Sequence, residues 1–114
     1  MIAVIFEFWT NPDKVDVYWD NAKAMSALVH DADGFLGIER FKSVTIENKF
    51  VSLSFWRDEA AIQSWRNRLQ HRMAQAAGRD GVFTDYRLRV AEVVRDYGMT
   101  ERDEAPADSR KAHD

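Results

Sequence analysis

Residues 50–69 read FVSLSFWRDEAAIQSWRNRL, a β-strand followed directly by an α-helix. In Phe50–Trp56, apolar residues alternate with Ser52 and Ser54, which is the pattern of a half-buried strand. Asp58 is a residue type suited to cap the N-terminus of the helix that follows. Apolar residues recur at helical spacing after it and predict one buried stripe, at Ile62, Trp65, Leu69 and Met73.

Three further strands and a second helix are predicted around this stretch. A β-branched and aromatic strand at Ile2–Trp9 precedes a helix that begins at Asn11-Pro12-Asp13 and ends before the Asp31–Gly34 turn. Strands are also expected at Phe35–Ser43 and Tyr86–Val94. The order β-α-β-β-α-β predicts an α+β, ferredoxin-like fold with both helices on one face of a four-stranded antiparallel sheet.

The second face of this sheet is also expected to carry apolar side chains. Such a face is normally covered, which predicts a homodimer formed by two sheets packed face to face. Residues 1–98 form the ferredoxin-like domain in this interpretation. Residues 99–114 are expected to be a disordered polar tail, because the chain from Thr100 onward lacks aromatic and large aliphatic residues.

Composition excludes several classes of function. The chain has 114 residues, a net charge of −3 and a pI near 5.6, which argues against binding to nucleic acid or to anionic membranes. It has no cysteine, so disulfides and thiol catalysis are excluded, and its three histidines lack the spacing of a metal site. The opening MIAVIFEFW has no basic region before it, so we expect no signal peptide and a cytoplasmic location.

Four stretches of the chain resemble the antibiotic biosynthesis monooxygenase (ABM) domain family. They are FLGIERF (35–41), LSFWRDEAAIQSWRN (53–67), HRMAQAAGR (71–79) and YRLRVAEVVRDYG (86–98). The resemblance covers residues 1–98 and implies a dimeric α/β-barrel. One branch of the family oxidises polycyclic phenols to quinones with O₂ and without a metal or flavin, and another branch degrades haem.

The resemblance implies a cofactor-independent monooxygenase that acts with O₂ on a small aromatic or polyketide-like phenol. One alternative is a non-catalytic dimer that binds a small ligand with the same fold. The other is a haem-degrading monooxygenase, with haem as its cofactor. In the haem branch the ligand histidine follows the helix tryptophan by ten residues, a position occupied here by Gln75, so haem degradation is not expected.

Trp65 and His71 are the leading candidates for a ligand site. Trp65 is either a core aromatic or a pocket wall that stacks on a flat ligand, and the resemblance implies a pocket role because a tryptophan on this helix lines the pocket in both branches. His71 follows it by six residues, slightly under two helical turns, so both can share a face. There His71 can take the proton of a phenol as the catalytic base, whereas the alternative is a surface imidazole.

Two further polar residues on this helix and after it are candidates for substrate binding. Asn67 can hydrogen-bond a ligand, or it marks a kink in the helix. Arg79 follows Gly78, where it either contacts substrate or neutralises the carbonyl groups at the end of the helix.

Charged residues also occur within predicted strands. Glu7 interrupts an apolar strand, and an unpaired carboxylate is expensive to bury, so we expect an ion pair with Arg87 or Arg89 of the last strand. Glu39 and Arg40 are expected to form pairs of the same kind. The alternative is a polar pocket that contains Glu7, Glu39 and Arg89.

Overall fold

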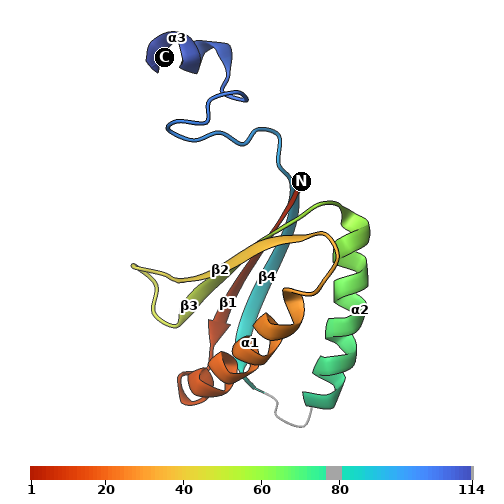
Figure 1. Ribbon diagram of the computed structural model, residues 1–114. Helices are drawn as coiled ribbons and strands as arrows, with labels where there is room; N and C mark the ends of the chain where they lie inside the picture. Colours follow the sequence, from red (N-terminus) through yellow and green to blue (C-terminus); the bar gives the residue numbers. More distant parts are fainter. Residues whose placement is uncertain (77–80, 114) are drawn as a thin grey trace.

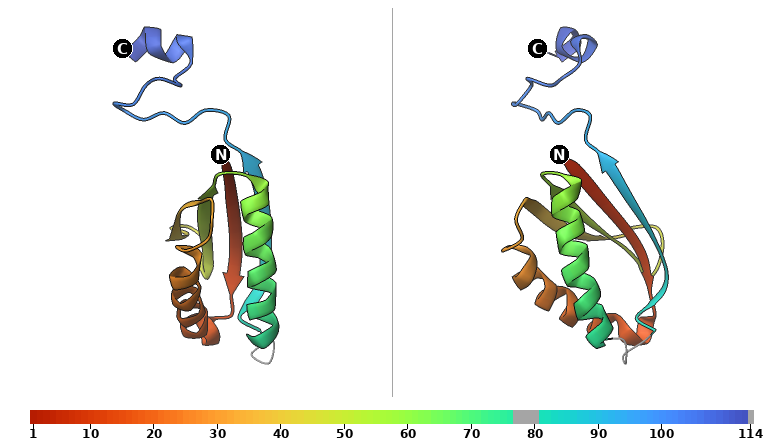
Figure 2. Two further views of the ribbon diagram at one scale, coloured as in Figure 1. Left: turned by 45° about the vertical axis from the view of Figure 1, so that its right-hand side comes forward. Right: turned by 90° about the vertical axis from the view of Figure 1, so that its right-hand side faces the viewer.

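The computed structural model describes the backbone of residues 1–76 and 81–113 and the side chains of residues 1–68 and 81–112. Its elements, in chain order, are β1 (Ile2–Thr10), the 3₁₀ helix η1 (Pro12–Lys14), α1 (Val15–Val29), β2 (Phe35–Lys42), β3 (Lys49–Trp56), α2 (Glu59–Ala76), β4 (Phe83–Glu92) and α3 (Ala107–His113). The strands form one antiparallel sheet in the order β2-β3-β1-β4, and α1 and α2 lie on the same side of it (Figures 1 and 2). The predicted ferredoxin-like α+β fold is confirmed.

The helix starts that were predicted from capping residues are also confirmed. The side chain of Asn11 accepts a hydrogen bond from the backbone N–H of Asp13 at 3.1 Å, at the start of η1. Asp58 accepts one from the N–H of Ala61 at 2.9 Å, just before α2 begins. In each case a side-chain oxygen satisfies an N–H group that has no partner within its own helix.

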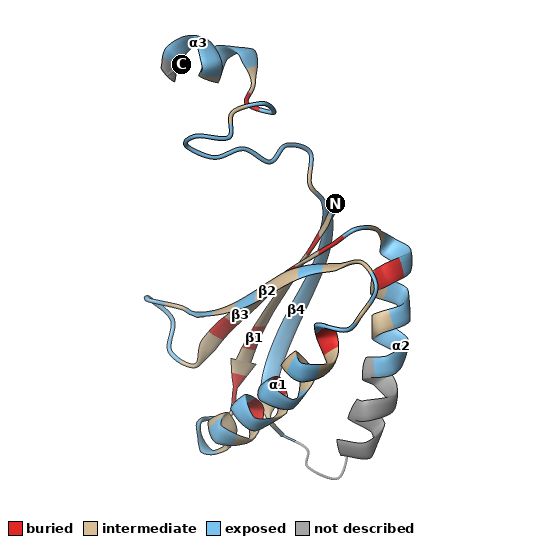
Figure 3. Cartoon of the chain, in the orientation of Figure 1, coloured by how far each residue is buried: buried red, intermediate tan, exposed pale blue. Residues whose placement is uncertain are grey.

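Two buried clusters join the sheet to the helices. In the first, Phe8 is fully buried and stacks on Tyr18 of α1 with ring centroids 4.5 Å apart. In the second, Val29 of α1 and Trp56 of β3 pack with Ala61 of α2. Figure 3 shows that burial is concentrated between the helices and strands β1 and β3, whereas β4 is exposed along most of its length.

The chain after β4 leaves the sheet and ends in α3, away from α1 and α2 (Figure 1). Arg102 donates to the carbonyl of Gly98 and to Ser109 Oγ, both at 3.2 Å, and lies over the ring of Tyr97. Arg110 donates to the carbonyl of Arg102 at 2.7 Å. The segment for which a disordered tail was expected therefore has its own short helix and local hydrogen bonds, and the domain boundary at residue 98 stays a prediction.

None of the helices in the described part of the chain is long and apolar enough to cross a membrane.

Candidate functional site

The cross-strand register determines which side chains share the helix-facing side of the sheet. Phe8 packs against α1, so Val4 and Phe6, which lie an even number of residues away on the same strand, point the same way. Two rows of paired residues cross the sheet on this side. We call these eight residues the floor: Arg40, Ser52, Phe6 and Leu88 in one row, and Ile38, Ser54, Val4 and Val90 in the next.

The floor is not fully covered by the helices. Leu88 and Val90 of β4 are 52% and 44% exposed, and Tyr86 on the same side of that strand is 62% exposed. At the middle of the floor the side chains are small: Ser52 is half-buried, and Ser54 is buried and accepts a hydrogen bond from the indole N–H of Trp56 at 2.9 Å. An apolar ligand could bury the exposed side chains of β4 at this end of the floor.

Trp65 of α2 lies beside one end of the floor. It packs against the cluster of Val29, Trp56 and Ala61, with its ring centroid 6.3 Å from that of Trp56. The guanidinium of Arg68 lies 5.5 Å from the Trp65 ring. Trp65 is half-buried, so it contributes to the core while part of its indole stays exposed.

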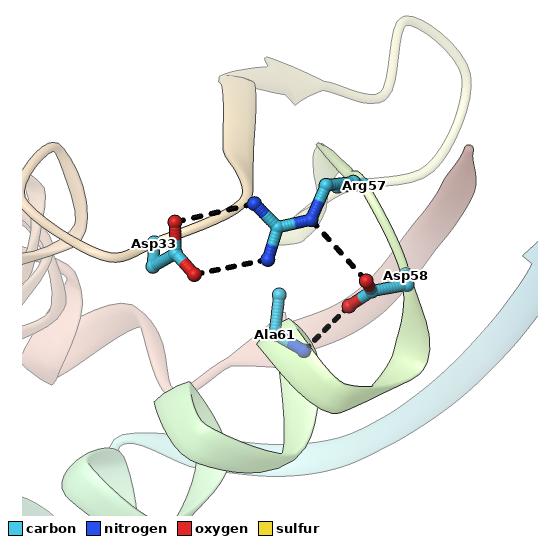
Figure 4. Close-up of polar contacts among 4 residues, drawn as sticks. All are labelled: Asp33, Arg57, Asp58 and Ala61. Carbon is cyan, nitrogen blue, oxygen red and sulfur yellow. Dashed lines mark hydrogen bonds and ion pairs between the residues drawn. The ribbon is translucent and has the colours of Figure 1, made fainter.

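A small groove of about 140 Å³ lies at the start of α2, and Trp65 is one of the residues that line it. In it, Arg57 donates two hydrogen bonds to the carboxylate of Asp33, at 3.2 and 2.9 Å, and one to Asp58 at 3.2 Å (Figure 4). The groove is smaller than the roughly 300–1,000 Å³ of typical ligand pockets, and its Arg57 is already neutralised. We therefore assign a structural role to Asp33, Arg57 and Asp58: they hold the α1–β2 loop against the start of α2.

The pKa values in this cluster agree with that assignment. The hydrogen bonds and charge of Arg57 lower the pKa of Asp33. The N–H of Ala61 and then Arg57 lower the pKa of Asp58, and the two carboxylates together raise the pKa of Arg57. All three groups are therefore charged near neutral pH, and none is suited to exchange a proton there.

The other site residues predicted on or after α2 are placed only in part. Asn67 lies on α2 with its side chain exposed. His71 lies within α2, but its side chain is outside the described residues, and Arg79 is outside them entirely. A shared pocket for Trp65 and His71 stays a prediction.

Glu7, Glu39 and Arg89 lie on the side of the sheet that faces away from the helices. Glu7 accepts a hydrogen bond from Arg89 at 3.1 Å and lies 4.0 Å from Lys49. Glu39 is exposed, and its register partner is Leu53 on the same side. The sheet therefore separates these charges from Trp65 and the floor.

Ion pairs were expected for both Glu39 and Arg40. The two residues lie on opposite sides of the sheet. The place of Arg40 in the floor puts its guanidinium beside the hydroxyl of Tyr18 on α1. Burial raises the pKa of Tyr18, and the charge of Arg40 opposes that increase. The signal available in the sequence was strand alternation, because adjacent residues of a strand point to opposite faces.

Among the described residues, no group of three or more His, Asp or Glu side chains is placed to hold a metal ion.

The chain belongs to the antibiotic biosynthesis monooxygenase family, whose model matches residues 1–77. It is 45% identical over 94 residues to "Jasmonate monooxygenase ABM" of Pyricularia oryzae. That match covers 82% of this chain and 44% of the relative, so the chain spans less than half of the relative's length. The family predicted from the sequence is thereby confirmed.

Solved structures show the same fold. A putative antibiotic biosynthesis monooxygenase from Deinococcus radiodurans has a TM-score of 0.73 at 12% identity, covering 86% of this chain and 97% of that one. The heme-degrader MhuD of Mycobacterium tuberculosis, solved with two hemes in its active site, has a TM-score of 0.65 at 24% identity, covering 86% of this chain and all of that one.

Proposed function

We propose that this chain is a monooxygenase that uses O₂ to oxidise a small, largely apolar substrate bound between the floor and α2, with no metal or flavin of its own. The observation that carries the proposal is the accessible apolar surface of Tyr86, Leu88 and Val90 on the helix-facing side of the sheet. Membership of the family and the relative that is named as a monooxygenase support it.

The chemistry that we propose is oxidation of a methylene group next to a phenol or enol. Once deprotonated, such a substrate is electron-rich and reduces O₂ itself. Converting CH₂ to C=O removes four electrons and two hydrogen atoms, which O₂ accepts: one oxygen atom enters the product and the other leaves as water. No further reductant is needed, so the protein has to remove a proton and exclude water.

The proposal is tested with 1,8-dihydroxyanthrone, an activated methylene compound. We expect uptake of one O₂ per molecule of quinone formed, above the rate without protein, and one ¹⁸O atom in the new carbonyl when ¹⁸O₂ is supplied. Hydrogen peroxide in place of labelled product, or no rate above the background across a panel of anthrones and hydroquinones, would contradict the proposal.

Two variants locate the reaction on the protein. Trp65→Phe removes indole surface beside the floor and should raise KM several-fold. Trp19→Phe on α1 is the matched control, because Trp19 is 40% exposed and packs on Tyr18 and Phe50.

Loss of a general base typically costs about 10²–10⁴-fold in rate, so His71→Ala should lower kcat by at least about 100-fold. Full activity in His71→Ala would remove His71 from the mechanism.

Haem degradation is the second candidate, and the structural likeness to MhuD is the observation that raises it. A haem site of this kind needs an imidazole to hold the iron. The described histidine side chain is His30, which follows α1 and lies edge-on to Phe35, with ring centroids 5.4 Å apart. It is not part of the floor, so among the described side chains no imidazole is placed to hold the iron of a haem bound there.

The family's ligand-histidine position is Gln75 in this chain, so titration with haemin is expected to give no saturable complex of one haem per chain. A sharp Soret band at that ratio, followed by its loss and by iron release under ascorbate and O₂, would instead make haem the substrate.

A further inference from the structure

Arg40 is a cation without a carboxylate partner in the described part of the chain. Its Nε atom is buried and donates no hydrogen bond within the described part of the protein. The ion pairs among the described residues involve Lys49, Arg57 and Arg89. The neighbour of Arg40 is the neutral hydroxyl of Tyr18.

An arrangement of this kind lowers the stability of the free protein. A buried N–H donor without a partner costs free energy, and the Nε of Arg40 is such a donor. Arg40 as a whole is half-buried, so an anion that enters from outside the chain can reach its side chain.

The position of Arg40 in the floor indicates the chemical nature of the rest of the ligand that carries this anionic group. Arg40, Ser52, Phe6 and Leu88 form one row across four strands, so polar character at β2 changes to accessible apolar surface at β4. With about 4.8 Å between neighbouring strands, the row is about 14 Å long. A small molecule with an anionic end and an apolar body matches this row.

We propose that Arg40 and Tyr18 bind a carboxylate of the substrate, so that the substrate is a small lipophilic carboxylic acid. This proposal rests on the proposed function, which places the substrate on the floor. A planar guanidinium matches the geometry of a carboxylate. When Tyr18 accepts from Arg40, its own hydroxyl proton remains free to donate to a second carboxylate oxygen.

The relative from Pyricularia oryzae supports the same substrate class, since jasmonate is the name of a carboxylate.

The test compares the binding of acids and of their methyl esters by calorimetry, with jasmonic acid and 2-naphthylacetic acid as probes. Wild-type protein should bind at least one of the two acids about tenfold or more tightly than its ester. A hydrogen bond to a charged group contributes enough for Arg40→Met to lower the affinity for the acid about 10- to 100-fold while leaving the ester unchanged. Arg95→Met is the matched control, because Arg95 is exposed beyond β4.

Two further measurements separate ligand binding from a structural role. Arg40→Met removes a half-buried charge and a buried N–H that has no partner, so the ligand-free variant should melt at the wild-type temperature or above it. Tyr18→Phe keeps the ring that stacks on Phe8, and should lower affinity for the acid by less than Arg40→Met does.

Equal binding of acids and esters by the wild type, equal losses for both in Arg40→Met, or no binding of either acid would overturn the carboxylate proposal. So would a large fall in the melting temperature of Arg40→Met. Oxidation of 1,8-dihydroxyanthrone, which has no carboxylate, reports separately on the proposed function, so each of the two proposals can fail without the other.

Discussion

Gly34→Ala is expected to lower the melting temperature by on the order of 10 °C. Gly34 has a φ of +81°, in the left-handed region, and a Cβ atom built on it would lie 2.6 Å from the Cβ of Ala61 in α2. The left-handed backbone costs a residue with a side chain about 1–2 kcal/mol. Forcing an extra carbon into a closed contact costs about 1–3 kcal/mol more.

Two other glycines separate these causes. Gly81 also has a positive φ, +88°, but its Cβ would meet the flexible end of Lys14 at 3.5 Å, so Gly81→Ala measures the backbone cost without the clash. Gly98 has neither a positive φ nor an atom within 4 Å, so Gly98→Ala should leave the melting temperature unchanged. Thermal unfolding of the three variants should rank Gly34→Ala as the least stable.

A double-mutant cycle tests the contact itself. Ala61→Gly alone should destabilise α2 by roughly 1 kcal/mol, the usual difference between these residues in a helix. Combined with Gly34→Ala, it removes the atom that the new Cβ meets, so the double variant should be more stable than the sum of the two single effects predicts. Strict additivity would show that the loop does not touch α2 at this point.

The same contact explains why Gly34 could be recognised from the sequence only as part of a turn. The Asp31–Gly34 run was expected to end the helix, and α1 does end at Val29. The requirement for glycine comes from β3 and α2, which are distant in sequence. The backbone N–H of Arg57 donates to the carbonyl of Gly34 at 2.8 Å, which brings the loop against Ala61.

Most strands could be located from the sequence because they are rich in β-branched and aromatic residues, in an apolar run at Ile2–Trp9 and in alternation with serines at Phe50–Trp56. The exception is β4, which was expected at Tyr86–Val94 and is found at Phe83–Glu92. Thr84 and Asp85 are polar and interrupt the apolar pattern there, and the sequence alone does not show which strand they pair with. In the fold this part pairs with the end of β1, where the register shifts between Trp9 and Thr10.

The candidate site could be predicted only where one residue carries the signal. Trp65 is a large aromatic on an amphipathic helix, and the structure places it beside the floor. The floor itself depends on cross-strand register, which joins Phe6 of β1 to Leu88 of β4 through pairings that composition does not reveal. The expectation that Arg40 forms an ion pair also failed because its position in the floor depends on this register.

The largest effect on assembly is expected from Leu53→Lys, which should convert a dimer into a monomer. Leu53 of β3 lies on the helix-free side of the sheet, opposite Ile5 of β1, with Val51 and Phe55 on the same side of its own strand. No helix in the described part of the chain covers this face (Figure 2). Two such sheets packed together bury this apolar surface, in an interface on the order of 2,000 Å² or more.

The charges on this face are compatible with burial between two copies. Glu7 is already within ion-pair distance of both Arg89 and Lys49 of its own chain, so a partner sheet would not leave its carboxylate unpaired. A lysine at position 53 would lie opposite Glu39 of β2, and dimerisation would have to remove both charges from water at the centre of the face in each copy.

Light scattering at micromolar concentration should give twice the chain mass of 13.2 kDa for the wild type and the single mass for Leu53→Lys. Val44→Lys is the matched control, because it makes the same charge change at a residue that is 99% exposed in the β2–β3 loop, and it should remain a dimer. A monomeric wild type would contradict the face-to-face assembly. A Leu53→Lys protein that stays dimeric would move the interface away from this side of the sheet.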